Sequence, residues 1–414
     1  MAVPKVVGIE TEYGVTMRGP VDPNPVTASS LLINAYVEHR AADWDFEDES
    51  PGRDARGFAR DSARAPEIET HLVNAVLTNG ARYYVDHAHP EYSTPECSDP
   101  LEVVRYDKAG ERILARSMEA ARRVLPAGQE VVVYKNNSDG KGNSYGCHEN
   151  YLVARDLPFG RLVAVLVPWF VSRQVFTGAG KVGAENGADA VEYQISQRAD
   201  FFEEEVGLET TLKRPIVNTR DEPHADPTRY RRLHVIVGDA NLCEEATYLK
   251  VGTTAVVLSM LEDGFCDTEL EMTSPVEAIR AVSHDPGLGA TVEIVGRGAC
   301  TALEVQWEFL RMARAWAAAA DPAPCGGAER VADILERWED VLTVLESDPE
   351  RLSGRLDWVT KRGLLDAYAA RDHLDWDDPK LALLAFQYHD VRPERSLYER
   401  LVRAGDRKST RLNS

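Results

Sequence analysis

The order of strand-like and helix-like segments along the chain is the feature that most restricts its fold. Strand-like runs lie in the first 240 residues, and after about residue 245 the apolar spacing is almost entirely helical. Parallel α/β folds alternate the two kinds of element, so this order predicts an α+β fold. We expect strands within 3–15, 77–86, 130–135, 150–154 and 233–238, and helices at 26–40, 100–125, 160–176, 245–262, 300–319, 328–347, 355–372 and 378–388.

Composition excludes several classes of function. The 414 residues carry a formal net charge of −21, which repels nucleic-acid phosphates, so a nucleic-acid partner is not expected. No apolar run approaches the roughly 18 residues of a membrane span, and the N-terminus lacks a signal-peptide pattern. The six cysteines are scattered without zinc spacing. These features predict a cytoplasmic protein with neither a nucleic-acid nor a membrane partner.

Two segments lack the pattern of a folded core. Residues 43–70 hold nine acidic and four basic side chains with few large apolar groups, which predicts a mobile surface loop. We expect this loop to act as a lid without an essential catalytic group, so its removal over 45–66 should leave ATP binding intact. Residues 406–414 are polar and aperiodic, and are expected to be either a non-native tail or a frayed natural terminus.

The first candidate functional residues are a pair of glutamates near the N-terminus. Glu10 and Glu12 stand two apart in a strand-like run, so both side chains leave the same face. Adjacent carboxylates repel each other unless a positive group lies between them, and a hard cation with oxygen ligands is one solution. A solvated strand face paired with Lys or Arg is the alternative.

A second polar constellation lies between residues 83 and 96. It places Asp86, His87, His89, Glu91 and Glu96 within eleven residues, where two prolines forbid a continuous helix. A carboxylate here could serve as nucleophile or general base beside a bound metal. An ordinary polar turn with salt bridges explains the same residues.

A third segment, 135–151, reads as a Gly- and Asn-rich loop that feeds a strand. His148 and Asn150 lie on one face of that strand. A lone histidine is usually structural, and the sequence does not place His148 beside the two glutamates.

Three further positions, Arg198, Arg220 and His234, are candidates for binding phosphate, although a single arginine more often forms a surface ion pair. The Gly178-Ala-Gly-Lys-Val-Gly sequence is not a P-loop, because Val182 stands where Ser or Thr must follow the lysine. Any nucleotide would therefore bind in a cradle of metal and arginine.

Four long motifs then resemble the Pup ligase/depupylase family of the glutamine-synthetase-like carboxylate–amine ligases, in the family's order over roughly residues 5–400. The motifs are Gly8-Ile-Glu-Thr-Glu-Tyr-Gly, Asn79-Gly-Ala-Arg-Tyr-Tyr-Val-Asp-His-Ala-His-Pro-Glu-Tyr, Asn143-Ser-Tyr-Gly-Cys-His-Glu-Asn-Tyr and Asn218-Thr-Arg-Asp-Glu-Pro-His.

The resemblance implies a fold and a set of site residues. The fold would be an antiparallel glutamine-synthetase-like β-sheet cradle packed with helices: a catalytic domain over 1–345 and a small, here truncated, C-terminal domain starting in 346–405. ATP and Mg²⁺ would be the cofactors, with Asp86 as the catalytic aspartate and Arg198, Arg220 and His234 on the phosphates. The implied magnesium ligands are Glu10, Glu12, Tyr84, Glu91 and His148.

The 43–70 insertion and His87-Ala-His89 resemble the depupylase branch. That branch hydrolyses the isopeptide bond between the C-terminal glutamate of the small modifier Pup and a substrate lysine, and deamidates a C-terminal glutamine of Pup. Its partners would be Pup and pupylated proteins. A Pup–protein ligase is the first alternative. A nucleotide-binding regulator without catalysis and a small-molecule ligase are the others.

Overall fold

A computed structural model describes residues 1–19, 24–37, 52–57, 73–266 and 270–405. The expected tail at 406–414 lies outside these ranges, as does most of the expected loop at 43–70. Of that loop only residues 52–57 are described.

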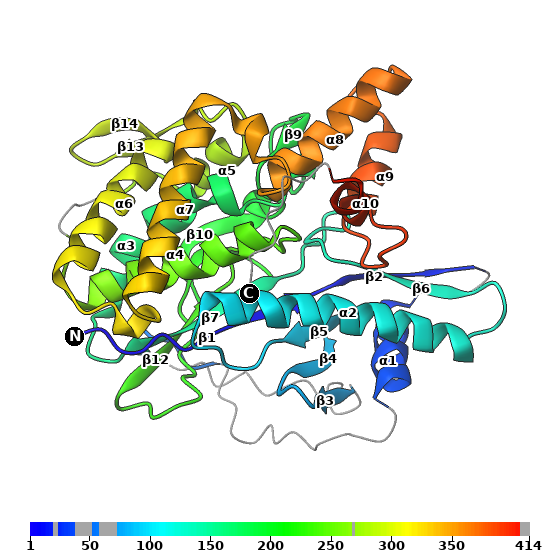
Figure 1. The fold of residues 1–414 in the computed structure, drawn as a ribbon, viewed down its shortest axis with the longest axis horizontal. Helices are drawn as coiled ribbons and strands as arrows, with labels where there is room; N and C mark the ends of the chain where they lie inside the picture. Colours follow the sequence, from blue (N-terminus) through cyan, green and yellow to red (C-terminus); the bar gives the residue numbers. More distant parts are fainter. Residues whose placement is uncertain (20–23, 38–51, 58–72, 267–269, 406–414) are drawn as a thin grey trace.

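A six-stranded sheet forms the centre of the described structure (Figure 1). Every neighbouring pair of its strands is antiparallel. In sheet order the strands are β12 (Tyr230–Val235), β7 (Cys147–Ala154), β1 (Val7–Glu12), β5 (His89–Ser93), β4 (Arg82–Asp86) and β3 (Asn74–Val76). This arrangement confirms the α+β class.

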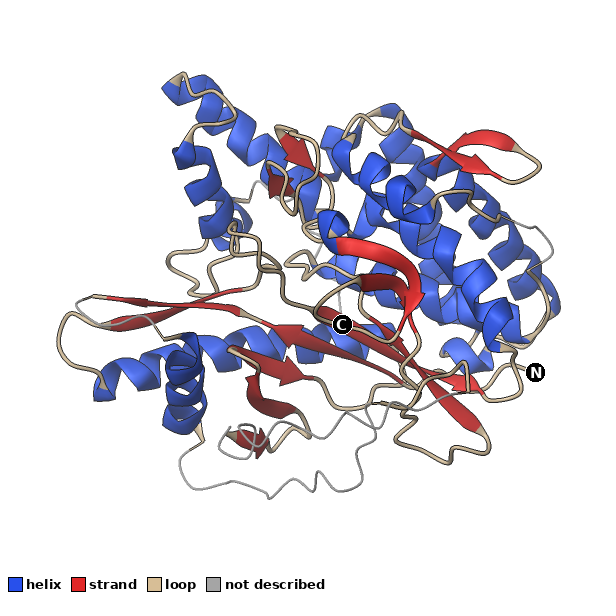
Figure 2. Ribbon diagram, turned by 180° about the vertical axis from the view of Figure 1, so that it is seen from behind, coloured by secondary structure: helices blue, strands red, loops and turns tan. Residues whose placement is uncertain are grey.

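The two faces of the sheet differ in burial. In β1, Val7, Ile9 and Thr11 are buried while the residues between them are half-buried. The buried face packs on α2 (Pro100–Val124) and α4 (Glu244–Glu262), while α4 in turn packs on α3 (Phe159–Thr177). Figure 2 shows the long strands running beneath the large group of helices that contains α3 and α4, with the long helix α2 on their lower side. The opposite face of the sheet carries the polar side chains.

Helix α3 is a core element. Fourteen of its 19 residues are buried, among them Trp169 and Phe176. By length and composition it is the one helix among the described residues that could cross a membrane, and 72% of its most apolar window is buried inside the protein. The expectation that no apolar run approaches a membrane span is therefore wrong for α3, which passes the test as a buried core helix.

A second, smaller core lies beside the main one. The strands β2 (Gly14–Arg18) and β6 (Glu130–Tyr134) pair antiparallel and pack with α1 (Pro25–Tyr36) around Tyr13 and Leu32. The remaining elements are β8 (Lys181–Val182), β9 (Tyr193–Gln194), η2 (Ala199–Phe201), β10 (Phe202–Gly207), β11 (Arg214–Asn218), α5 (Pro275–His284), β13 (Thr291–Ile294), β14 (Gly298–Thr301), α6 (Ala302–Ala319), η3 (Ala323–Cys325), α7 (Ala328–Ser347), η4 (Pro349–Leu352), α8 (Asp357–Asp372), α9 (Pro379–Tyr388) and α10 (Leu397–Ala404).

Most predicted helices are confirmed within two residues, because long amphipathic or buried patterns are strong signals. Three expectations are wrong. The strand within 3–15 is two strands, β1 and β2, the helix expected at 26–40 ends at Tyr36, and the region after 245 contains the hairpin β13–β14. Trp358 of α8 and Leu381 of α9 share the main core with the preceding helices, so the domain division at 345 and 346 stays a prediction.

A buried lysine in α8 predicts an unusual pH dependence of stability. Lys361 is 1% exposed, its Nζ donates to the carbonyl of Gly180, and the structure shows no ion pair for it within the described ranges. Burial lowers the pKa of Lys361 from 10.5 to about 7, with Asp357 and Asp239 opposing the shift. The folded protein therefore holds this proton more weakly than the unfolded chain.

We expect Lys361→Met to stabilise the protein, and to do so most at pH 7 and below. Between about pH 7 and 10.5 the lysine is charged in the unfolded chain and neutral in the folded protein. The free-energy cost of burying Lys361 in the parent protein therefore declines by about 1.4 kcal/mol for each pH unit in this range. Urea unfolding of both proteins at pH 6.5, 7.5 and 8.5 measures this trend. An advantage of the variant that grows with pH would contradict it.

Candidate active site

The register of the sheet brings the predicted site residues together. Glu10 of β1 is paired with His148 of β7, and Glu12 is paired with Glu91 of β5. Glu91 is in turn paired with Tyr84 of β4. Side chains in directly paired positions leave the same face of a sheet, so five residues from four strands converge on the polar face.

One group of possible metal ligands is formed by Glu10, His148 and His234. Their ligand atoms all lie within 4.8 Å of one another, and the two imidazole rings are 5.0 Å apart. Asn150 ties the group together: its Nδ2 donates to Glu10 at 2.8 Å, and its Oδ1 lies 3.0 Å from His234 Nδ1.

Electrostatics keeps this group in the ligand-competent form. Burial opposes ionisation of Glu10, but the hydrogen bond from His148 and the nearby His234 and Arg232 hold the pKa of Glu10 below its usual value. Burial, followed by Arg232, lowers the pKa of His234 well below 6.5. A carboxylate beside a neutral imidazole is a suitable pair of donors for a divalent cation.

A second group contains Glu12, Asp86 and Glu91, again with ligand atoms within 4.8 Å of one another. Glu91 is 2% exposed and accepts a hydrogen bond of 2.5 Å from the Tyr84 hydroxyl. Burial raises the pKa of Glu91 well above 4.5, and the charges of Asp86 and Glu12 raise it further. Three carboxylates at this separation repel one another, and a bound cation removes the repulsion.

Asp86 lies at the end of β4 and is the most accessible carboxylate of this group. Its side chain is 34% exposed and lies 3.0 Å from His87 Nδ1. Burial opposes ionisation, yet the hydrogen bond from His87 holds the pKa of Asp86 below its usual value. Asp86 is therefore an ionised carboxylate that can meet a substrate from solvent.

The donors of both groups fit divalent cations, since the Glu10 group combines a carboxylate with imidazole nitrogens and the Glu12 group offers three carboxylates. All five predicted metal ligands lie here, although Tyr84 reaches the site through its hydrogen bond to Glu91. One placement differs from the sequence expectation, because His234, predicted at the phosphates, lies with Glu10 and His148. The predicted catalytic Asp86 lies beside two metal candidates, as a carboxylate that acts next to a bound metal should. The individual roles stay predictions.

A cavity of about 540 Å³ adjoins the Glu10 end of the site. Its lining includes Glu10, Arg82, Tyr84, Asn150, Arg220 and Arg232. The Arg82 guanidinium stacks 3.9 Å from the centre of the Tyr84 ring, and Arg232 donates to Asn150 at 2.9 Å. Glu96 and Glu222 line the cavity as well as Glu10, so its three guanidinium groups suit a ligand with several negative charges that binds together with a cation at the Glu10 group.

Sequence reasoning missed Arg82 and Arg232. Both could have been found from the strand period of two, because Arg82 precedes Tyr84, and Arg232 precedes His234, by two residues. Arg82 therefore lies on the same face as Tyr84, and Arg232 on the same face as His234, both of which the sequence had already indicated as candidate site residues.

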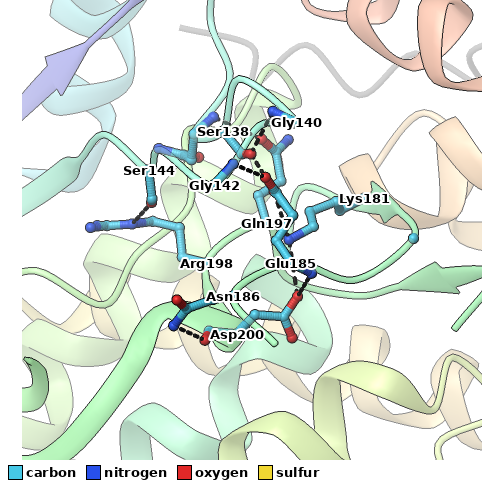
Figure 3. Close-up of polar contacts among 12 residues, drawn as sticks. Ser138, Gly140, Gly142, Ser144, Lys181, Glu185, Asn186, Gln197, Arg198 and Asp200 are labelled. Atoms are coloured by element: carbon cyan, nitrogen blue, oxygen red, sulfur yellow. Dashed lines mark hydrogen bonds and ion pairs between the residues drawn. The ribbon is translucent and has the colours of Figure 1, made fainter. Parts of the chain in front are cut away.

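Arg198 does not line this cavity. It is 1% exposed, and its Nη1 donates to the carbonyl of Ile236. Its Nε donates to Ser144 Oγ at 3.3 Å, as Figure 3 shows. Burial, followed by Arg214, lowers its pKa to about 10, and the charge of Glu12 opposes the shift. The structure thus separates Arg198 from Arg220.

The loop after α3 is not a phosphate-binding loop. Lys181 forms ion pairs of 3.0 Å with both Glu185 and Asp200, as Figure 3 shows. The loop also follows the C-terminus of a helix, whereas a P-loop precedes an N-terminus. The exclusion of a P-loop is confirmed.

Fold and site together define a class of protein: an enzyme whose open antiparallel sheet carries clustered carboxylates and histidines beside an arginine-lined cavity. The chain belongs to the Pup-ligase protein family, whose model matches residues 5–412. It is 53% identical to a depupylase of Acidothermus cellulolyticus, with 97% of this chain and 81% of that protein covered. It is 48% identical to the Pup deamidase/depupylase of Mycobacterium tuberculosis, with 98% and 82% covered.

Solved structures confirm the glutamine-synthetase-like fold. The complex between Pup and its ligase PafA matches with a TM-score of 0.83 at 35% identity, covering 99% of this chain and 78% of that one. PafA in complex with ADP matches with a TM-score of 0.74 at 38% identity, covering 82% and 75%.

Proposed function

We propose that this chain is a depupylase: a hydrolase that cleaves the isopeptide bond between Pup and a substrate lysine and deamidates a C-terminal glutamine of Pup. The observation that carries the proposal is the 48–53% identity to relatives of that name, together with the intact carboxylate groups around Asp86. Relatives named Pup–protein ligase are 39–42% identical, which makes ligation the second candidate.

ATP and Mg²⁺ are the proposed cofactors. A PafA neighbour holds ADP, and the cavity beside Glu10 offers Arg82, Arg220 and Arg232 to phosphate oxygens. The Glu10 and Glu12 groups would hold the cations, which supply positive charge that neutralises phosphate and polarises a carbonyl oxygen.

The chain's own residues then have distinct tasks. Arg82 and Arg232 orient the anion, and both are already held, by Tyr84 and by Asn150 respectively. Tyr84 fixes the Glu91 carboxyl. Asp86 either attacks the acyl carbon of the scissile bond as a nucleophile or takes a proton from the water that attacks it, and in both cases the lysine amine, or ammonia from a glutamine, leaves.

The proposed partners are Pup and pupylated proteins, and the proposed location is the cytoplasm. All six cysteines are free, and five of them are buried. Unpaired thiols in a chain of this size support a reducing compartment.

The direct test is incubation with a Pup-conjugated protein, Mg²⁺ and ATP, followed by mass spectrometry. Depupylation releases the unmodified target and Pup with a C-terminal glutamate. New conjugates formed with equimolar ADP release from free Pup and a target would instead establish the ligase. Neither product from the full chain would overturn the proposal.

Glu10→Gln and Glu12→Gln should each weaken ATP binding by about 10–100-fold when Mg²⁺ is present, because each removes an anionic oxygen from a cation site. Calorimetry with Mg²⁺ and with EDTA measures the effect, and we expect the variants and the parent to converge in EDTA. Glu119→Gln, on the exposed side of α2, is the matched control. Unchanged affinity in Mg²⁺ would remove the glutamates from the cation sites.

A further inference from the structure

Residues 52–57 lie against the segment that carries Arg220. The backbone N–H of Ala55 donates to the carbonyl of Thr219 at 2.8 Å, and the N–H of Asp221 donates to the carbonyl of Arg53 at 3.0 Å. Asp54 and Arg220 form the β-bridge between the two segments. The middle of the expected loop is therefore bound to the body of the protein, contrary to the expectation of free mobility at these positions.

The Asp54 side chain strengthens this contact. It is 3% exposed and accepts hydrogen bonds from Thr219 Oγ1 at 2.7 Å and from Arg56 through its backbone N and Nη2 at 2.8 Å. Burial opposes ionisation, but the bonds from Arg56 and Thr219 hold the pKa of Asp54 below its usual value. Asp54 thus bridges its own segment to Thr219 as a buried, charged acceptor.

The segment held by Asp54 is fixed from the other side as well. Thr219 donates its N–H to the carbonyl of Gly207 at 2.8 Å, and Asp221 binds Arg155 at 2.6 Å. Arg220 stands between these anchors, and its side chain lines the 540 Å³ cavity. Its direction depends on both neighbours, because the backbone of a residue sets where its side chain starts.

We propose that Asp54 is a positioning residue for Arg220: through Thr219 it holds the Arg220 backbone so that the guanidinium faces an anion in the cavity. This inference rests on the proposed function, since it takes the anion to be the phosphates of ATP. It replaces the expectation that removal of residues 45–66 leaves ATP binding intact, because that deletion removes Asp54.

The coupling also runs in reverse. If docked residues 53–55 favour ATP, bound ATP must favour the docked state by the same factor. The amide of Ala55, which is bonded to Thr219, should then exchange its hydrogen more slowly with ATP and Mg²⁺ than without them.

The test makes three measurements on each variant. They are the ATP affinity by calorimetry, the KM for ATP and kcat of the cleavage reaction determined separately, and the melting temperature. Asp54→Ala should weaken ATP binding and raise KM by about tenfold, while kcat at saturating ATP stays within about twofold. Thr219→Val should behave alike and Thr219→Ser should restore binding, because serine keeps the hydroxyl. The double variant Asp54→Ala with Thr219→Val should be no worse than either single one.

Asp372→Asn is the matched control. Asp372 also receives two bonds from an adjacent arginine, Arg371, but on α8 away from the cavity. We expect this variant to bind ATP with parental affinity.

Parental ATP affinity in a folded Asp54→Ala would overturn the inference, and so would a lower melting temperature with unchanged KM. If Asp54→Ala does not fold, equal ATP affinity of the Thr219→Val and Thr219→Ser variants overturns it instead. Failure of the parent protein itself to bind ATP in Mg²⁺ would overturn the proposed function, which is a separate result.

Discussion

Asp86→Asn should reduce isopeptide cleavage by about 10³-fold or more while leaving ATP affinity within about threefold of the parent. The substitution removes the charge of the one accessible carboxylate of the Glu12–Asp86–Glu91 group and nearly preserves its shape. Loss of a nucleophile or general base at a reacting carbon typically costs two to four orders of magnitude. ATP binding depends mainly on the arginine-lined cavity and on the cations held by Glu10 and Glu12, whereas Asp86 is assigned to the substrate and not to a cation.

Single-turnover cleavage of a Pup conjugate, followed by mass, measures the first quantity, and calorimetry measures the second. Asp377→Asn, at an exposed position between α8 and α9, is the matched control and should cleave at the parental rate. Substantial cleavage by Asp86→Asn would remove Asp86 from the mechanism. Equal loss of cleavage and ATP binding would assign it to cation binding alone.

Glu149→Gln should lower the free energy of unfolding by about 3–5 kcal/mol. Glu149 lies on the buried face of β7 and forms two bonds with Arg173 of α3, at 2.5 and 2.9 Å, with both side chains at most 1% exposed. Removing one partner leaves the other charge buried without compensation, which costs far more than an exposed pair contributes.

Urea unfolding measures the loss, with Glu339→Gln as the control. Glu339 pairs with Arg314 at the surface, so its loss should be below about 1 kcal/mol. Replacing both buried partners, as in Glu149→Met with Arg173→Met, should recover much of the stability. A loss below about 1 kcal/mol for Glu149→Gln would mean that water reaches Arg173.

Sequence alone predicts the residues of the site better than their grouping. The two-residue spacing of Glu10 and Glu12 is enough to place both on one face, and β1 confirms this. Glu91 follows Glu12 by 79 residues, and His148 follows it by 136. Which strands pair over such separations depends on the whole sheet. No local pattern contains that information.

The same limit explains why the sequence does not show which cationic residues line the cavity. Nothing in the residues next to them in the sequence distinguishes Arg198 from Arg220. In the structure Arg198 is buried against Ser144 and Ile236, while Arg220 lines the cavity. Burial decides between them, and burial of a polar residue follows from tertiary packing. The short hairpin β13–β14 was missed because four-residue strands carry too few residues for a clear period.

The register of the sheet has a consequence for how this sequence can change length. Along each strand that carries a candidate ligand, side chains point alternately to the polar face and to the core, as Glu10 does between the buried Ile9 and Thr11. A gain or loss of one residue within such a strand would turn the carboxylates into the core and the apolar side chains toward the substrate. Length changes inside β1, β4, β5, β7 and β12 are therefore subject to a parity constraint, whereas insertions between these strands are free of it. A long insertion such as 43–70 can enter between α1 and β3 without changing the parity of any strand.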